Sequence, residues 1–176
     1  MSENRVLFIG ASGSGTTTLG KAYAQKLGIP HIDLDNLFWK PTEIPFTEFR
    51  TQEELLTLAN SKIYNHKSWV ISGDPSKWGI GIEGRLTKVI FLECPTKVRV
   101  VRLNKRALDT LGDSVTVGGS NHETHQRFIE WTKYYDKGGL PGRSREKQLA
   151  WLDTLDCEIV KFRSDAPLDE LIAKLA

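Results

Sequence analysis

The sequence has few cysteines and only one methionine, and its two cysteines, Cys94 and Cys157, stand far apart in 176 residues. Two isolated cysteines exclude a disulfide scaffold. Without a Cys-x-x-Cys pair, the sequence also lacks the usual spacing of a zinc site. We therefore expect both thiols to be packing residues in a reducing compartment.

The sequence also lacks a large excess of charge and a long apolar run. Its 24 basic and 22 acidic residues leave a formal charge of +2, which argues against a protein dedicated to coating nucleic acid. The apolar run 6–9 is too short for a membrane span or a signal-peptide core. We predict a cytoplasmic protein, monomer or homodimer, with neither membrane nor nucleic acid as a partner.

Short apolar runs alternate with helical patterns along the chain. Runs that predict strands occur at 6–9, 31–34, 69–71, 89–92 and 157–162. The segment 47–65 has the apolar spacing of a helix, as do most of the other intervening segments. This alternation predicts an α/β fold with a five-stranded parallel sheet flanked by helices. We expect one domain over residues 1–176, with a small, glycine-containing lid region over about 112–145.

The strongest motif follows the first predicted strand and opens a helix. It consists of Gly10, Ala11, Ser12, Gly13, Ser14, Gly15, Thr16, Thr17 and Thr18. Gly10 and Gly15 have the spacing of a phosphate-binding P-loop, in which backbone N–H groups converge on an anion at a helix N-terminus. The hydroxyl of Thr17 is then placed to hold Mg²⁺.

Thr16 stands where that motif has a lysine. The lost charge-assisted hydrogen bond is worth roughly 1.5–3 kcal/mol, or about 10–150-fold in binding. Backbone anion binding survives this loss, but efficient phosphoryl transfer then needs another cation, for which Lys21 and Lys40 are candidates. A phosphotransferase and a non-catalytic nucleotide-binding regulator both stay open. A sulfotransferase-type loop ranks low, because Gly13 stands where such loops carry a lysine.

With this loop, the segment 27–35 and the pair Phe38 and Trp39 resemble the small P-loop kinases related to adenylate kinase. The nearest likeness is to the group called topology-modulation or adenylate-kinase-like proteins. The resemblance implies a P-loop NTPase fold, ATP or another nucleoside triphosphate with Mg²⁺, and a small phosphoryl acceptor such as a nucleoside or nucleotide.

The resemblance also implies roles for two carboxylates after the second strand. Asp33 would hold water around Mg²⁺, and Asp35 would orient or deprotonate the acceptor hydroxyl. The alternative is a turn or helix-cap pair. Glu93, which ends the fourth predicted strand, resembles a carboxylate that holds Mg²⁺ through water, with a solvated strand end as the alternative.

Arginines supply the remaining predicted site residues. Arg99, Arg102 and Arg106 recur at helical spacing and predict one basic stripe, for which solvated charge is the alternative. The resemblance implies that Arg102 and Arg106 bind the nucleotide base and phosphate. It also implies that Arg127 contacts the transferred phosphoryl group. We expect Arg143 and Arg145 to close over the phosphates and to compensate for Thr16.

Overall fold

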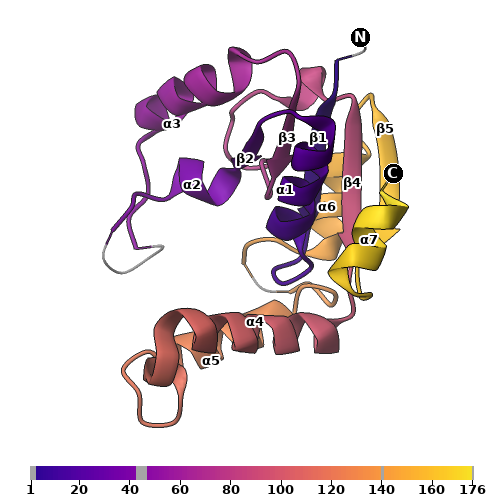
Figure 1. The fold of residues 1–176 in the computed structure, drawn as a ribbon. Helices are drawn as coiled ribbons and strands as arrows, with labels where there is room; N and C mark the ends of the chain where they lie inside the picture. The colour runs from indigo at the N-terminus through magenta and orange to yellow at the C-terminus, as the bar shows by residue number, and fades with distance from the viewer. Residues whose placement is uncertain (1–2, 43–46, 140, 176) are drawn as a thin grey trace.

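A parallel sheet between helices forms the body of the molecule in the computed structural model, which describes residues 3–42, 47–139 and 141–175 (Figure 1). Within these residues the strands are β1 (Arg5–Gly10), β2 (His31–Asp33), β3 (Trp69–Ser72), β4 (Lys88–Glu93) and β5 (Glu158–Arg163). Their order is β2-β3-β1-β4-β5, and every pairing is parallel. The predicted α/β fold with a five-stranded parallel sheet is confirmed.

Strand β1 lies at the centre of the sheet. Val6 is in register with Val70 of β3 on one side and with Lys88 of β4 on the other. The carboxyl end of β1 therefore lies at the same edge as the ends of β3 and β4. In open parallel sheets ligands bind at this edge, so the register places the glycine-rich loop where a binding site is expected.

Two apolar cores cover the two faces of the sheet, because successive side chains of a strand point to opposite faces. Leu7 and Ile9 of β1 belong to one core, together with residues of α2 (Leu34–Phe38), α3 (Gln52–Ala59) and α6 (Arg145–Leu152). Phe8 belongs to the other, with residues of α1 (Thr16–Leu27) and α7 (Leu168–Lys174). All three of these β1 side chains are fully buried.

The helix predicted over 47–65 begins later than expected. Thr51 caps α3: its side chain accepts from the backbone of Glu54, and the Glu54 side chain accepts from the backbone of Thr51. This capping box satisfies the first donors of the helix and fixes its start at Gln52. The helical prediction for residues 47–51 was therefore wrong. A π-helical turn, Asn60–Tyr64, continues α3 to its end.

Helices α4 (Thr96–Leu111) and α5 (His122–Lys133) form a hairpin that projects beyond the carboxyl ends of the strands (Figure 1). We call residues 96–133 the arm. A 3₁₀ turn, Gly112–Val115, follows α4, and the two helices bury Leu103 and Ile129. The arm overlaps the predicted lid region. No described helix has both the length and the apolar character needed to cross a membrane.

Candidate functional site

The glycine-rich loop turns tightly between β1 and α1. Gly13 and Gly15 have φ values of +80° and +98°, a region that side chains disfavour. A Cβ atom on Gly13 would lie 2.9 Å from the carbonyl oxygen of Arg99 in α4. The loop therefore needs glycine at position 13 both for its backbone conformation and for its close approach to the arm.

The N-terminus of α1 has backbone donors without a side-chain acceptor. Gly15 precedes the helix, no side chain caps it, and its first turn contains no acidic residue. The first N–H groups of a helix carry partial positive charge. Thr17 and Thr18 are exposed beside them. Uncapped donors at the end of a glycine-rich loop fit a phosphate or another anion.

The two carboxylates after β2 have different environments. The Oδ1 atom of Asp33 accepts a hydrogen bond of 3.0 Å from the backbone N–H of Asp35, so Asp33 caps α2. The pKa of Asp35 is raised, first by partial desolvation of its carboxyl group and then by the negative charge of Asp33. The positive charges of Arg143 and Arg106 oppose this rise. Two of the predicted arginines thus lie near enough for their charges to favour the ionised form of Asp35.

The three arginines of the predicted basic stripe on α4 lie in different environments. Arg99 is fully buried and forms an ion pair of 2.7 Å with Asp136, so the alternative of solvated charge was wrong for this residue. Arg102 lies with its Nη1 atom 3.6 Å from the Sγ atom of Cys94, while Arg106 acts on Asp35. The three arginines of α4 therefore have different surroundings: Arg99 is buried in an ion pair, Arg102 lies at the end of β4, and the charge of Arg106 acts on Asp35.

Arg127 contacts its own helix in this structure. Its side chain is exposed on α5, and its Nη2 atom donates to Thr124 Oγ1, at 3.4 Å on the same helix. Of the lysines considered as substitutes for Thr16, Lys40 pairs with Glu54 at 3.2 Å. Lys21 is exposed on α1, where its charge contributes to lowering the pKa of His31.

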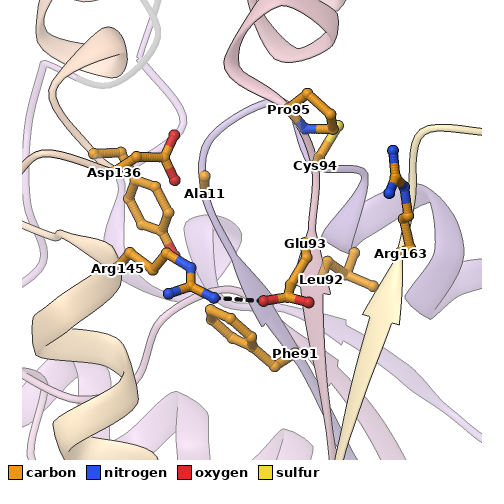
Figure 2. A pocket seen from close by; sticks show the side chains of 10 residues that line it. Ala11, Phe91, Leu92, Glu93, Cys94, Pro95, Asp136, Arg145 and Arg163 are labelled. Carbon is orange, nitrogen blue, oxygen red and sulfur yellow. Dashed lines mark hydrogen bonds and ion pairs between the residues drawn. The ribbon is translucent and has the colours of Figure 1, made fainter.

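A cavity of about 310 Å³ lies between the start of the loop and the carboxyl end of β4 (Figure 2). Across it, the Nη2 atom of Arg145 donates to the Oε1 atom of Glu93 at 2.6 Å. Glu93 is thus neither a bare strand end nor a free carboxylate, because its charge is paired with an arginine that we predicted to contact phosphate. Ala11, Tyr135 and other side chains complete the wall.

Sequence reasoning missed Gln148, a buried residue behind the loop. Its amide nitrogen donates to the carboxylate of Asp74 at 2.8 Å and to the carbonyl of Gly10 at 3.4 Å. A glutamine in a short helix carries no sequence signal for such a contact, because its partners lie 74 and 138 residues away.

The fold and the loop together define the class of this protein as one with the P-loop kinase fold. A solved shikimate kinase from Bacteroides thetaiotaomicron matches it with a TM-score of 0.53 and 21% identity, covering 99% of this chain and 96% of that one. A gluconokinase from Sinorhizobium meliloti 1021 matches with a TM-score of 0.51 and 20% identity, covering 97% and 88%.

The sequence comparisons identify the family more closely. The protein YqaC of Bacillus subtilis (strain 168) is 32% identical over 173 residues, which cover 98% of this chain and 96% of YqaC. The chain belongs to the same family as YqaC. The shikimate kinase of B. thetaiotaomicron is also 58% identical over a stretch of 31 residues, 18% of each chain. No protein-family model matches the chain.

Proposed function

We propose that this protein binds a nucleoside triphosphate with Mg²⁺ on the Gly10–Thr18 loop and transfers the γ-phosphoryl group to a small acceptor beside Asp35. The observation that carries this proposal is the uncapped N-terminus of α1 beneath a loop of small residues. Asp35 follows β2 at the same edge of the sheet, where the charges of Arg106 and Arg143 reach it.

The residues at this edge fit magnesium with a triphosphate. No group of three or more potential metal-ligating side chains occurs among the described residues. Magnesium needs no such group, because it keeps several waters and binds through one or two protein oxygens and the substrate phosphates. The Thr17 hydroxyl and the Asp33 carboxylate are the oxygens we assign to it. When bound, the ion neutralises charge on the transferring group.

The chain's own side chains supply the other roles. Asp35 is exposed, and its raised pKa makes it a better proton acceptor for an attacking hydroxyl than an ordinary aspartate. We assign phosphate contacts to Arg106, Arg143 and Arg145, and the nucleotide base to Arg102. We also assign a contact with the transferred phosphoryl group to Arg127, which lies on α5 of the arm.

The comparisons support a small-molecule acceptor without identifying it. Shikimate kinase and gluconokinase are both named for small molecules. We therefore propose a small molecule with a hydroxyl group as the acceptor. The more specific proposal is a nucleoside or nucleotide, as in an adenylate-kinase-like enzyme. The cytoplasmic location and the monomeric or homodimeric state stay predictions.

Calorimetric titration tests the proposal directly. We would titrate the native chain and Thr16→Lys with Mg²⁺–ATP, Mg²⁺–GTP, ADP and inorganic phosphate. We expect micromolar binding of a nucleoside triphosphate by the native chain. Thr16→Lys should bind the same nucleotide at least about tenfold more tightly, because the lysine restores a charge-assisted hydrogen bond to the phosphates. Absence of nucleotide and phosphate binding by the native chain would contradict the proposal.

A second function, nucleotide-dependent regulation without turnover, is favoured by Thr16 itself. Acceptor screening separates the two functions. Phosphoryl transfer to shikimate, gluconate or a nucleoside monophosphate, lost by about 10²–10⁴-fold in Asp35→Asn, supports the kinase. Tight nucleotide binding with no product from any acceptor, in the native chain and in Thr16→Lys alike, supports the regulator.

A further inference from the structure

Gln148 is a buried polar residue whose side chain touches both the phosphate loop and the end of a neighbouring strand. It is 1% exposed. Its Nε2 atom donates to Asp74 Oδ2 at 2.8 Å and to the Gly10 carbonyl oxygen at 3.4 Å. Its Oε1 atom accepts from the Tyr135 hydroxyl at 2.6 Å. Every polar atom of this side chain therefore has a partner.

The partners determine how the amide of Gln148 is oriented. A carboxylate and a backbone carbonyl only accept hydrogen bonds, so the NH₂ group must face Asp74 and Gly10. The carbonyl oxygen of the amide then faces Tyr135, which must donate. Burial raises the pKa of the Tyr135 hydroxyl well above its usual value, which keeps this donor protonated. The orientation is thus unique.

These contacts join three separate parts of the molecule. Gly10 begins the phosphate loop, Asp74 follows β3, and Tyr135 follows the last helix of the arm. The second oxygen of Asp74 accepts from the backbone and the hydroxyl of Ser76, at 3.1 and 2.7 Å. The carboxylate of Asp74 is consequently held from both sides, and Gln148 supplies the side nearest the loop.

The first turn of α6 ties the same network to the arm. The backbone N–H of Arg145 donates to the Tyr135 carbonyl at 2.9 Å, and the Arg145 side chain pairs with Glu93. Arg145 and Gln148 are three residues apart and lie on one face of α6. A displacement of the residues after α5 therefore pulls on Tyr135, and through it on Gln148 and the loop.

We propose that Gln148 is a positioning residue of the nucleotide site: it holds the Gly10 end of the phosphate loop and the Asp74 carboxylate in place and couples both to the arm through Tyr135. This inference rests on the proposed function for the identity of the ligand. It adds a residue that contacts no nucleotide but determines how well the loop is arranged to receive one.

The test compares Tyr135→Phe with Tyr64→Phe. Tyr64 is the matched control, because its hydroxyl also donates to a buried backbone carbonyl, that of Ile80, away from the loop. For each variant we would measure Mg²⁺–ATP affinity by calorimetry and the midpoint of urea unfolding. We expect Tyr135→Phe to weaken affinity about three- to fivefold, because it leaves the Gln148 amide short of one partner. Tyr64→Phe should lower only the unfolding midpoint.

Substitutions of Gln148 itself sharpen the test. Gln148→Leu should weaken Mg²⁺–ATP binding about tenfold, because Asp74 and Tyr135 each lose a buried partner. Gln148→Glu places a second carboxylate against Asp74. The affinity of this variant should be weakest at high pH and recover as the pH falls, since the introduced carboxyl group, once protonated, can again donate to Asp74. The Mg²⁺–ATP affinity of the native chain should change less with pH.

Two results would overturn the inference, and they are distinguishable. Native affinity in Tyr135→Phe and Gln148→Leu, with loss of stability only, would make Gln148 a core residue without a positioning role. Failure of the native chain to bind either Mg²⁺–ATP or inorganic phosphate would remove the proposed function and the inference with it. Tyr135→Phe retains the aromatic ring, so it stays informative if Gln148→Leu fails to fold.

Discussion

The sheet body and the arm are stabilised in different ways. In the body, Leu7, Phe8 and Ile9 of the central strand are completely buried between two layers of helices. On the arm, Val101 is 68% exposed and Val117 is 89% exposed. The body is thus held by apolar burial distributed over many residues, whereas much of the arm surface contributes little to folding.

Polar contacts of Arg99 join the two ends of the arm, which we call its root, to each other and to the carbonyl of Cys94 after β4. The buried guanidinium of Arg99 binds Asp136 and Thr96 through Nη2, the Cys94 carbonyl through Nε and the Thr132 carbonyl through Nη1. A few directional contacts of this kind are more easily rearranged than a packed core. The body therefore provides the scaffold of the proposed site, whereas closure of the arm over a ligand stays a prediction.

The largest expected effect comes from a substitution at the junction of the two regions. Gly13→Val should lower the free energy of unfolding by about 3 kcal/mol, because it combines a positive φ with a close contact. The added Cβ would lie 3.0 Å from Leu103 Cγ as well as against Arg99. Urea denaturation measures the loss, and titration with Mg²⁺–ATP should show no binding.

Gly28→Ala is the matched control for this substitution. Gly28 has a φ of +65°, but a Cβ there meets nothing within 4 Å. It should cost only the strain of the left-handed conformation, about 1 kcal/mol, and leave nucleotide binding intact. Equal losses from both variants would show that the loop and the arm are not tightly packed at Gly13.

Breaking the root of the arm should have the next largest effect. Arg99→Met removes the buried guanidinium and its hydrogen bond to the Cys94 carbonyl, while the Thr132 carbonyl keeps the backbone N–H of Tyr135 at 3.3 Å. We expect a loss of about 2 kcal/mol, below the usual cost for a broken buried pair, because the carboxylate of Asp136 is partly exposed and stays hydrated. Calorimetric unfolding gives the value.

Lys105→Ala supplies the corresponding control on the arm surface. Lys105 pairs with Asp109 at 2.7 Å, but both side chains are exposed. Removing this pair should change the free energy of unfolding by less than about 0.5 kcal/mol. A comparable loss from both variants would mean that Arg99 does not anchor the arm.

The pH dependence of stability should differ between histidines of the two regions. Burial lowers the pKa of His31 in the body and that of His125 in the arm. A lowered pKa means that the unfolded state binds more protons than the native state. Stability is then fully present above the unfolded pKa, near 6.5, and declines as the pH falls below it toward the native value.

We expect His31→Gln to flatten this acid decline more than His125→Gln, because His31 lies between α1 and β3, with Nε2 3.1 Å from Ser72 Oγ. Urea unfolding at several values between pH 5 and pH 8 provides the comparison. A larger change from His125→Gln would place the main acid-sensitive histidine in the arm instead.

The smallest effect is expected at the tip of the arm. Val117→Ala should change the free energy of unfolding by less than about 0.5 kcal/mol, as for an ordinary surface position. Val89→Ala, the same change at a fully buried position of β4, should cost roughly 2 kcal/mol. A substantial loss from Val117→Ala, measured by thermal unfolding, would show that the tip is covered in solution.

The fold was predictable because its signals are local. The three central strands are short apolar runs, and Gly28 ends α1 in the left-handed conformation typical of a glycine after a helix. The start of α3 was misjudged because apolar spacing extends back to Phe49, while the backbone is determined by the capping box at Thr51. At this position the hydrogen bonds of the capping box, rather than the spacing of apolar residues, determine where the helix begins.

The site was predictable only in part. The loop and Asp35 follow from residues adjacent in the sequence, whereas the arginines were grouped by helical spacing alone. Spacing places side chains on a helix face but not against a partner. Arg99 is set apart from Arg106 by its ion pair with Asp136, which comes 37 residues later in the chain, after the end of α5.

The sequence by itself determined the alternation of strands and helices, the glycine-rich loop and the absence of its lysine. These features depend on backbone conformation and on residues close together in the chain. Only the tertiary structure decided that Arg99 is buried, that Arg145 pairs with Glu93 and that Gln148 joins the loop, Asp74 and Tyr135. Such pairings arise where distant segments meet at one edge of the sheet, and burial there makes each polar group find a partner.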